Sequence, residues 1–446
     1  MIGLLVANVL FFAVGLGLLP LLRIARTRGE LLARLPLAYL AGTAATGIVA
    51  AHLALIEVPL GLAELVVLAG IVLLLGLRRL RGADAVAVRL DRDETWSTAI
   101  GGAALLVAGV LVAHAWRTYE VRPPLEWDGW AIWGTRARAL YEFGGATGPA
   151  FTTDAYLPLQ HPLLLPVLEA IDFRAMGTFD PTLVHVQLAL LALGFLLAFV
   201  TLLRGLVPDF VIGLVALALL SAEPVLQQLS TNMADVPLAL FVAAGLVGVG
   251  RWLATDETWA LTGGALFLGA GTLTKNEGVF FALAAFVAAA PVARGRLREL
   301  GAAALGVLAV FLPWRLNVEL RDLPLVEYEF RNAFSPAYLS DHADRVRPAA
   351  DGLAEQIFSL EWGLIPLLFA ASIVAAVLAR RHALAAFAGL WAVLAFAGLL
   401  LVYWISTIPI ELAMVWSGDR TIVTLVVGAA ALSGLLATPA AARGTR

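Results

Sequence analysis

The stretch that decides the fold lies at residues 97–145, where STAIGGAALLVAGVLVAHAW (97–116) is followed at a short interval by EWDGWAIWGTRARALYEFGG (126–145). The first part is apolar over about 20 residues, which is the length that an α-helix needs to cross the hydrocarbon core of a bilayer. The second part places carboxylates between tryptophans and continues with arginines in a helix-like pattern. We therefore expect a membrane-spanning helix that leads into an aromatic, charged segment at the membrane surface.

The composition of the whole chain agrees with this interpretation. Its 446 residues are 61% hydrophobic and 14% charged, whereas a soluble domain carries about 25% charged residues. The mean hydropathy is +0.89. The absence of cysteine excludes disulfides, thiolate catalysis and cysteine-bound metals. The sequence predicts an all-α polytopic membrane protein with about thirteen spans, near residues 1–22, 36–56, 61–77, 97–116, 182–203, 209–222, 234–252, 258–273, 278–292, 299–316, 361–379, 383–403 and 420–437.

Arginine placement predicts the orientation of these spans, because short cytoplasmic loops are enriched in basic residues. The arginine clusters fall on one side if the N-terminus is outside and the C-terminus is cytoplasmic. The first run lacks a basic n-region and a small-residue cleavage site, so we expect a retained helix rather than a signal peptide. We divide the chain into three N-terminal spans with a basic cytoplasmic loop (1–95), a central module (96–316) and a C-terminal part (317–446).

Segment 117–181 is the most informative of the predicted outer segments, which also include 317–360, 404–419 and two shorter turns at 221–236 and 273–278. Arg136 and Arg138 lie off its apolar helical face, and two glycines follow the pattern at 144 and 145. This pattern predicts a short amphipathic helix on the membrane surface. The tryptophans also fit an interfacial aromatic belt. The apolar face consists of Trp130, Trp133, Ala137, Leu140 and Tyr141.

Charged residues on the predicted outer face are the candidates for chemistry. Glu126 and Asp128 lie in a membrane-apposed turn, where partial desolvation makes a carboxylate more basic. Lys275, the one lysine among 30 basic residues, lies in the turn TKNEG, and Arg420 lies in WSGDRTIV. Both oppose the charge bias of the loops. Lys275 could instead snorkel or pair with Glu277, and Arg420 could pair with the neighbouring residue 419, an aspartate.

These motifs resemble the GT-C superfamily of membrane glycosyltransferases, in particular bacterial relatives of the protein mannosyltransferases and of the aminoarabinose transferase of lipid A. The resemblance rests on the stretch 126–145 with AYLPLQHPLLLPVLEA (155–170), on STNMADVPLALFVAAGL (230–246) and on LGAGTLTKNEGVFFALAAF (268–286). It covers residues 97–300 and leaves the first three spans outside. It implies a GT-C-like transmembrane helical bundle whose external loops carry short amphipathic helices.

The resemblance also implies roles for individual residues. It makes Asp128 the catalytic base, with Glu126 as the alternative, because the two acids are adjacent in many relatives and separated by a tryptophan here. It makes Lys275 a ligand of the donor lipid phosphate. Arg420, Arg136 and Arg138 are further candidates for this phosphate because of their predicted positions on the outer face, although Arg136 and Arg138 could instead snorkel. The implied substrate contacts are His161, Asp235, Tyr156 and Trp130. Prolines around His161 also suit a purely structural hydrogen bond. Some members use a divalent ion, Mg²⁺ or Mn²⁺, for which the candidate ligands are Asp128, Asp235 and His161.

The function that the resemblance implies is an inverting transfer of a sugar from a polyprenyl-phosphate donor to a hydroxyl of an envelope glycan, glycolipid or protein. One carboxylate suffices as base, because a phosphate leaving group needs positive charge rather than a general acid. The expected location is the outer face of a bacterial plasma membrane. The alternatives are an envelope polysaccharide polymerase or ligase, and a membrane transporter or flippase. No basic patch favours nucleic acid, and no nucleotide-binding motif is present.

Overall fold

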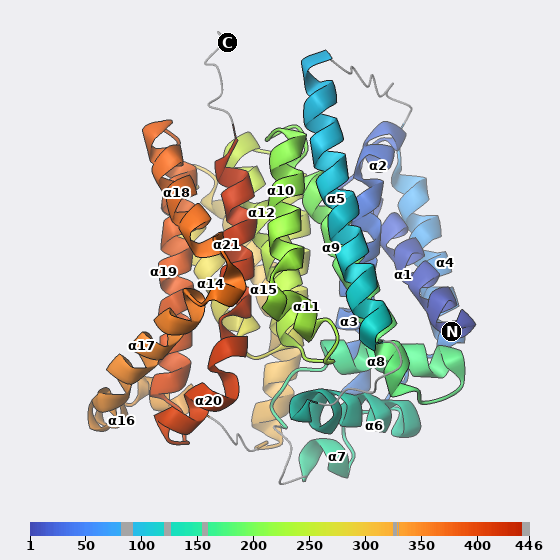
Figure 1. Ribbon diagram of the computed structural model, residues 1–446. Helices are drawn as coiled ribbons and strands as arrows, with labels where there is room; N and C mark the ends of the chain where they lie inside the picture. Colours follow the sequence, from blue (N-terminus) through green and yellow to red (C-terminus); the bar gives the residue numbers. More distant parts are fainter. Residues whose placement is uncertain (82–91, 120–125, 154–158, 324–327, 329, 439–446) are drawn as a thin grey trace.

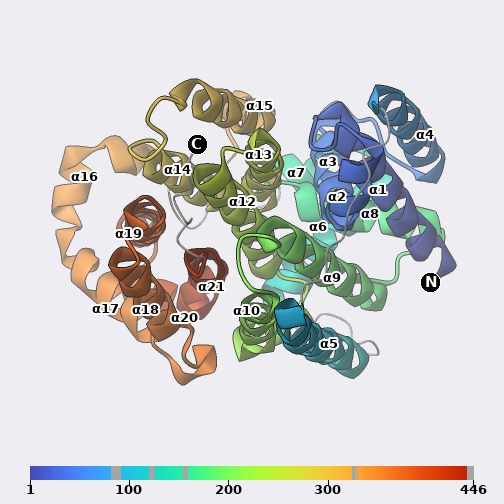
Figure 2. The same ribbon diagram turned by 90° about the horizontal axis from the view of Figure 1, so that it is seen from above.

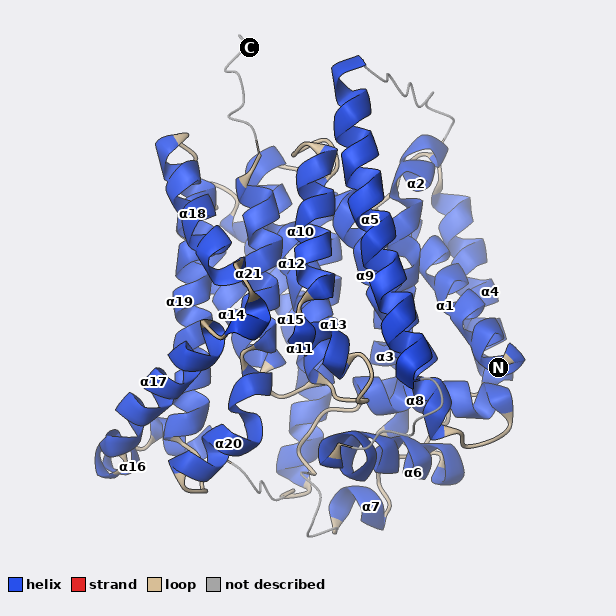
Figure 3. Ribbon diagram, in the orientation of Figure 1, coloured by secondary structure: helices blue, strands red, loops and turns tan. Residues whose placement is uncertain are grey.

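We describe the protein from a computed structural model, which covers residues 1–81, 92–119, 126–153, 159–323, 328 and 330–438. Over these residues the regular secondary structure is helical, with isolated β-bridges and no extended strand (Figure 3). The helices form one bundle, and most of them lie roughly parallel or antiparallel to a common axis (Figure 1).

Eight helices in this part of the chain are long and apolar enough to cross a membrane. A ninth is reached if the segments Ala343–Trp362 and Ile365–Leu378, which meet at 101°, form one span. The chain is therefore an all-α membrane protein. The eight candidates are α1 (Ile2–Leu21), α2 with η1 and α3 (Arg28–Arg34, Leu35–Leu37, Ala38–Ala54), α5 (Arg92–Tyr119), η3 with α9 (Pro181–Leu183, Val184–Leu203), α12 (Asp235–Thr255), α15 (Leu297–Leu320), α19 (His382–Trp404), and α20 with α21 (Ile410–Thr421, Val423–Leu436).

The other predicted spans are also helical, but they are shorter or more charged. With its 13 residues, α10 is about 20 Å long, which is less than a hydrocarbon core of about 30 Å. In Figure 1, α10 and α18 nevertheless stand beside the longer helices. The count of thirteen crossings thus exceeds the eight or nine that length and composition support. The helices concerned are α4 (Leu62–Arg79), α10 (Asp209–Ser221), α13 (Thr258–Thr274), α14 (Gly278–Ala289) and α18 (Ile365–Leu378).

Short helices cover one end of the bundle. In Figure 1, α6, α7, α8, α16 and α17 all lie at this end, and α2 lies at the opposite end. Helix α20 belongs to the same covered end, where the sequence predicts a short outer segment over 404–419. The short elements of the described chain that are not yet bounded are η2 (Asp128–Gly134), α6 (Thr135–Phe143), α7 (Pro149–Thr152), α8 (Leu164–Met176), α11 (Glu223–Gln228), η4 (Phe330–Phe334), α16 (Pro336–Asp341), η5 (Ala343–Arg345), α17 (Val346–Ile357) and η6 (Leu360–Trp362).

Seen along the bundle axis, α1, α3 and α4 form a group on one side and α12 occupies the centre (Figure 2). The central position of α12 fits its burial, since 94% of its spanning window is enclosed by other helices. The close packing of α1 on α3 depends on Gly15, because a Cβ there would collide with the Ala38 carbonyl. Helix α8 contacts α1, α3 and α6, and therefore joins the N-terminal group to the covered end.

The segment from Asp128 to Phe143, which lies at the covered end, differs from the amphipathic helix that the sequence predicts. Residues Asp128–Gly134 form a π-helical turn, η2, before α6 begins. The wider i→i+5 turn changes the helical register, so Arg136 becomes fully buried and Trp130 is half-exposed at 48%. The prediction that Arg136 lies off the buried face is therefore wrong. The predicted end holds, since α6 stops at Phe143 and Gly144 follows with φ of 88°.

Candidate active site

A cavity of about 640 Å³ opens at the covered end of the bundle. This volume is within the range of about 300–1,000 Å³ that small-molecule sites occupy. Its walls come from η2, the loop before α8, the start of α12, the turn between α13 and α14, the end of α19, the turn after it, and α20. The polar and charged side chains that line it include Glu126, Asp128, His161, Asp235, Lys275, Glu277, Tyr403, Ser406, Ser417, Arg420 and Thr421.

Asp128 and Arg420 form an ion pair in this cavity, although 292 positions separate them in the sequence. Arg420 Nη1 donates to Asp128 Oδ2, and Nη2 donates to the carbonyl oxygen of Trp416 at 2.7 Å. Arg420 lies in the last turn of α20, where the helix dipole favours a cation. Within the described residues, the ion-pair partner of Arg420 is thus Asp128 and not the adjacent Asp419. Asp128 Oδ1 accepts no hydrogen bond from the described residues.

Lys275 forms a second ion pair in the cavity. Its Nζ lies 2.7 Å from Asp235 Oδ1 and 3.5 Å from Glu277 Oε1. Asp235 is the first residue of α12, and Lys275 follows the end of α13. Burial opposes the charge on Lys275, but the carboxylates of Asp235 and Glu277 outweigh it and hold the pKa of the amine above its ordinary value. Lys275 is therefore a fixed positive charge rather than a snorkelling side chain.

His161 contributes a neutral ring to the cavity wall. The ring stacks on Trp133 at 5.3 Å between centroids, and its Nδ1 lies 3.4 Å from Nδ2 of Asn276. Burial, with the positive charges of Lys275, Arg136 and Arg420, lowers the pKa of His161 well below its ordinary value. The ring is therefore uncharged at neutral pH, and both its stacking and its position at the cavity suit a fixed polar contact.

A hydroxyl cluster in the cavity was not predicted from the sequence. Tyr403 Oη lies 3.0 Å from Ser417 Oγ and donates to Thr421 Oγ1 at 3.1 Å. Ser417 and Thr421 are four residues apart in α20 and therefore share one helical face. Arg420 lies between them in the sequence. Two hydroxyl residues spaced four positions apart in a largely apolar stretch are the sequence signal that could have indicated this cluster. The cluster gives the cavity neutral donors and acceptors beside its charges.

Four predicted site residues lie elsewhere or outside the described chain. Arg136 is buried between the rings of Phe151 and Trp314, with its guanidinium carbon 5.4 and 6.0 Å from their centroids. Arg138 is exposed and pairs with Glu142 at 2.8 Å. Trp130 does not line the cavity but meets the edge of Trp127, with centroids 5.0 Å apart. Tyr156 lies outside the described residues.

In the described part of the chain, no three His, Asp or Glu side chains are grouped to hold a metal ion. Asp128 and Asp235 each pair with a protein cation instead. Fold and cavity together define a helical membrane protein with a charged site at one end of its bundle. Comparison with family models, curated proteins and solved structures finds no match to this chain.

Proposed function

We propose that this chain is an inverting glycosyltransferase that takes a sugar from a polyprenyl-phosphate donor and transfers it to a hydroxyl acceptor. The observation that carries the proposal is that Asp128, Arg420 and Lys275 line one cavity at the covered end, where Asp128 pairs with Arg420 and Lys275 pairs with Asp235. A carboxylate beside phosphate-binding cations is the set of groups that this reaction needs. The acceptor is a hydroxyl of an envelope glycan, glycolipid or protein.

In the proposed reaction, Asp128 takes the proton of the acceptor hydroxyl while the hydroxyl oxygen attacks the anomeric carbon. The bond between this carbon and the phosphate oxygen breaks, and its electron pair leaves with the phosphate. Lys275 and Arg420 stabilise the departing anion through charge-assisted hydrogen bonds. Attack opposite the leaving group inverts the configuration at the anomeric carbon. His161 and the Tyr403 cluster supply neutral contacts for sugar hydroxyls.

The covered end is the outer face of a bacterial plasma membrane in this proposal. Support comes from the arginine-bearing helix α2, which lies at the opposite end of the bundle (Figure 1), as basic residues favour the cytoplasmic side. The thirteen helices found at the predicted spans would then place the N-terminus outside and the C-terminus inside. The short α10, α13, α14 and α18 would cross with help from their packed neighbours.

The decisive experiment is a transfer assay with the purified protein in nanodiscs. A panel of undecaprenyl-phosphate sugars is supplied with membrane glycolipid, glycan and protein fractions as acceptors. We expect one labelled product from the wild type, and complete loss of transfer with retained donor binding in Asp128→Asn. The matched control is Asp256→Asn, which changes an exposed aspartate that pairs with Arg296 away from the cavity.

Transfer that survives Asp128→Asn would overturn the role of Asp128 as the base. A product consisting of repeated glycan units would instead identify the polymerase or ligase alternative. Movement of a lipid-linked sugar between leaflets without any new glycosidic bond would identify the transporter or flippase alternative. The substitution Glu126→Gln tests whether the second acid of the stretch shares the work of Asp128.

A further inference from the structure

Asn232 lies directly behind the turn that carries Asp128. It is fully buried and has a φ of 56°, a left-handed conformation that is uncommon outside glycine. Its side-chain Nδ2 donates to the carbonyl oxygen of Gly129 at 3.2 Å and to Glu169 Oε2 at 3.4 Å. Gly129 is the residue after Asp128 in η2. The amide of Asn232 therefore connects the turn of Asp128 to helix α8.

Two buried acids, Glu169 and Asp172, stand three residues apart on α8 and so share one helical face. Burial raises the pKa of Glu169 to about 8, and burial together with Glu169 raises the pKa of Asp172 well above its ordinary value. Glu169 Oε1 and Asn232 Oδ1 are buried acceptors without a hydrogen bond in the described chain. A protonated Glu169 supplies the donor that this group of acceptor atoms lacks.

The same face of α8 continues into the N-terminal helices. Asn8 of α1 donates to Asp172 Oδ1 at 3.4 Å, and Tyr39 of α3 donates to Asn8 Oδ1 at 2.5 Å. Gln187 of α9 donates to Tyr39 Oη at 3.4 Å. A row of buried and partly buried polar groups thus runs from α1 and α3 to α8, where Asp172 and Glu169 share one helical face, and on to the turn of Asp128.

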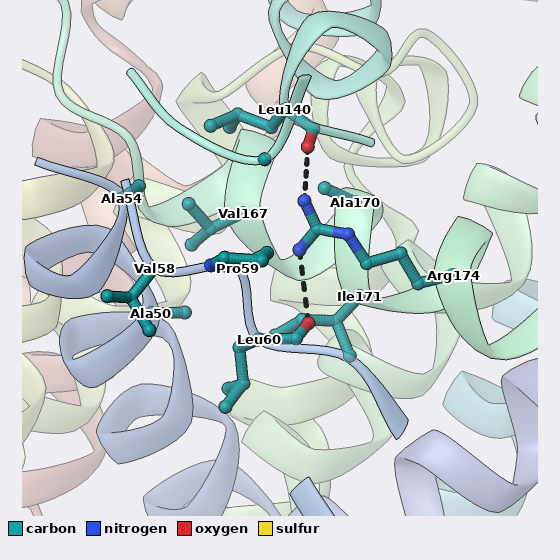
Figure 4. Close-up of a pocket in the computed structure, with 11 residues that line it drawn as sticks. Ala50, Ala54, Val58, Pro59, Leu60, Leu140, Val167, Ala170, Ile171 and Arg174 are labelled. Atoms are coloured by element: carbon teal, nitrogen blue, oxygen red, sulfur yellow. Dashed lines mark hydrogen bonds between the residues drawn. The ribbon is translucent and has the colours of Figure 1, made fainter. Parts of the chain in front are cut away.

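Arg174 adds a second connection from α8. Figure 4 shows its guanidinium between two carbonyl oxygens, those of Leu60 and Leu140. Leu60 precedes α4, and Leu140 belongs to α6, which directly continues η2. Gly3 of α1 also meets the end of α8, where a Cβ would collide with the Ala175 carbonyl. Helix α8 therefore contacts the N-terminal helices on one side and the continuous segment of η2 and α6, which carries Asp128, on the other.

We propose that Asn232 and Glu169 are positioning residues that fix the turn of Asp128, and that α1 and α3 support them through Asp172, Asn8 and Tyr39. This assigns a function to the N-terminal helices, which contribute no side chain to the cavity. The proposal rests on the proposed function in one respect only, namely that sugar transfer depends on the position of Asp128. Glu169 acts here as a neutral acid, so glutamine can replace it and leucine cannot.

The test measures hydrogen exchange of backbone amides at residues 128–134 by mass spectrometry in nanodiscs, together with kcat and KM of the transfer. For Glu169→Leu and Tyr39→Phe we expect exchange in this turn to rise about two- to tenfold. We expect kcat to fall with KM for the undecaprenyl-phosphate sugar unchanged. Glu169→Gln should match the wild type in exchange and in kcat. The control is Thr46→Val, which changes a buried α3 hydroxyl that has no hydrogen bond in the described chain.

Tyr39→Phe removes a single oxygen, and this variant decides the question if Glu169→Leu does not fold. Unchanged exchange at 128–134 in a folded Tyr39→Phe protein would overturn the link to α3. Loss of kcat in Glu169→Gln equal to that in Glu169→Leu would overturn the neutral-acid role. If the wild type transfers no sugar at all, the proposed function fails, whereas a selective rise in exchange still upholds the positioning of the turn.

Discussion

Replacing Lys275 with methionine separates the structural role of the buried ion pair from its role in binding. The side chains of Lys275 and Asp235 are only 13% and 6% exposed, and Nζ lies 2.7 Å from Oδ1. Removing one partner of such a pair leaves the other charge buried, at a cost of about 3–5 kcal/mol. We expect Lys275→Met to lower the free energy of unfolding by this amount. Lys275→Met leaves two carboxylates, Asp235 and Glu277, without their cation. Adding Asp235→Asn removes the nearer of these charges and should restore part of the loss.

Binding should respond differently from stability. The double variant still lacks the cation, so its affinity for undecaprenyl phosphate should stay as weak as that of Lys275→Met. Thermal unfolding in nanodiscs gives the stability, and titration with undecaprenyl phosphate gives the affinity. Arg251→Met is the matched control, because Arg251 pairs with Glu257 at 2.6 Å and does not line the cavity. A double variant that binds the phosphate like the wild type would refute Lys275 as a phosphate ligand.

Further predictions concern the second cation, the buried acid and one backbone conformation. Arg420→Gln removes charge-assisted hydrogen bonds of about 1.5–3 kcal/mol, and titration should show undecaprenyl phosphate binding about 10- to 100-fold more weakly; unchanged affinity would contradict this. The pKa of Glu169 rises on folding from 4.5 to about 8, so the native state binds the proton more tightly and stability should fall as pH increases across this interval. Denaturation followed against pH should show a smaller slope for Glu169→Gln, and an equal slope would exclude Glu169 as its source. Gly144→Ala should cost about 1–3 kcal/mol, because the φ of 88° strains any side chain, whereas Gly148→Ala, at a φ of −71° with open space, should be nearly neutral in thermal unfolding.

Local patterns in the sequence were enough to single out several cavity residues. Asp128 stands out as an acid among tryptophans, and Lys275 stands out as the one lysine of the chain. Both are visible within a few positions, because hydropathy and charge change abruptly there. Helix positions follow for the same reason, since each apolar run is continuous. How many of these helices cross the membrane fully depends on length, and short helices such as α10 fall below the length that one crossing needs.

Contacts between distant segments could not be predicted in this way. The adjacent acid was a natural partner for Arg420, yet its partner is Asp128, because helix packing brings together residues that are 292 positions apart. The burial of Arg136 depends on the π-helical turn before it, which a constant 3.6-residue period does not anticipate. The Tyr403 cluster forms only when α19 and α20 pack side by side. Such features require the three-dimensional arrangement.

The ion pairs inside the cavity have a consequence for how a substrate would bind. Arg420 already holds a carboxylate, and Lys275 holds two more. Under the proposed function, a donor phosphate would therefore have to exchange with these acids rather than bind cations that are already free. A phosphate that bound Arg420 would release Asp128, so the donor itself would free the proposed base. Until then the ion pair with Arg420 would keep this carboxylate from activating water.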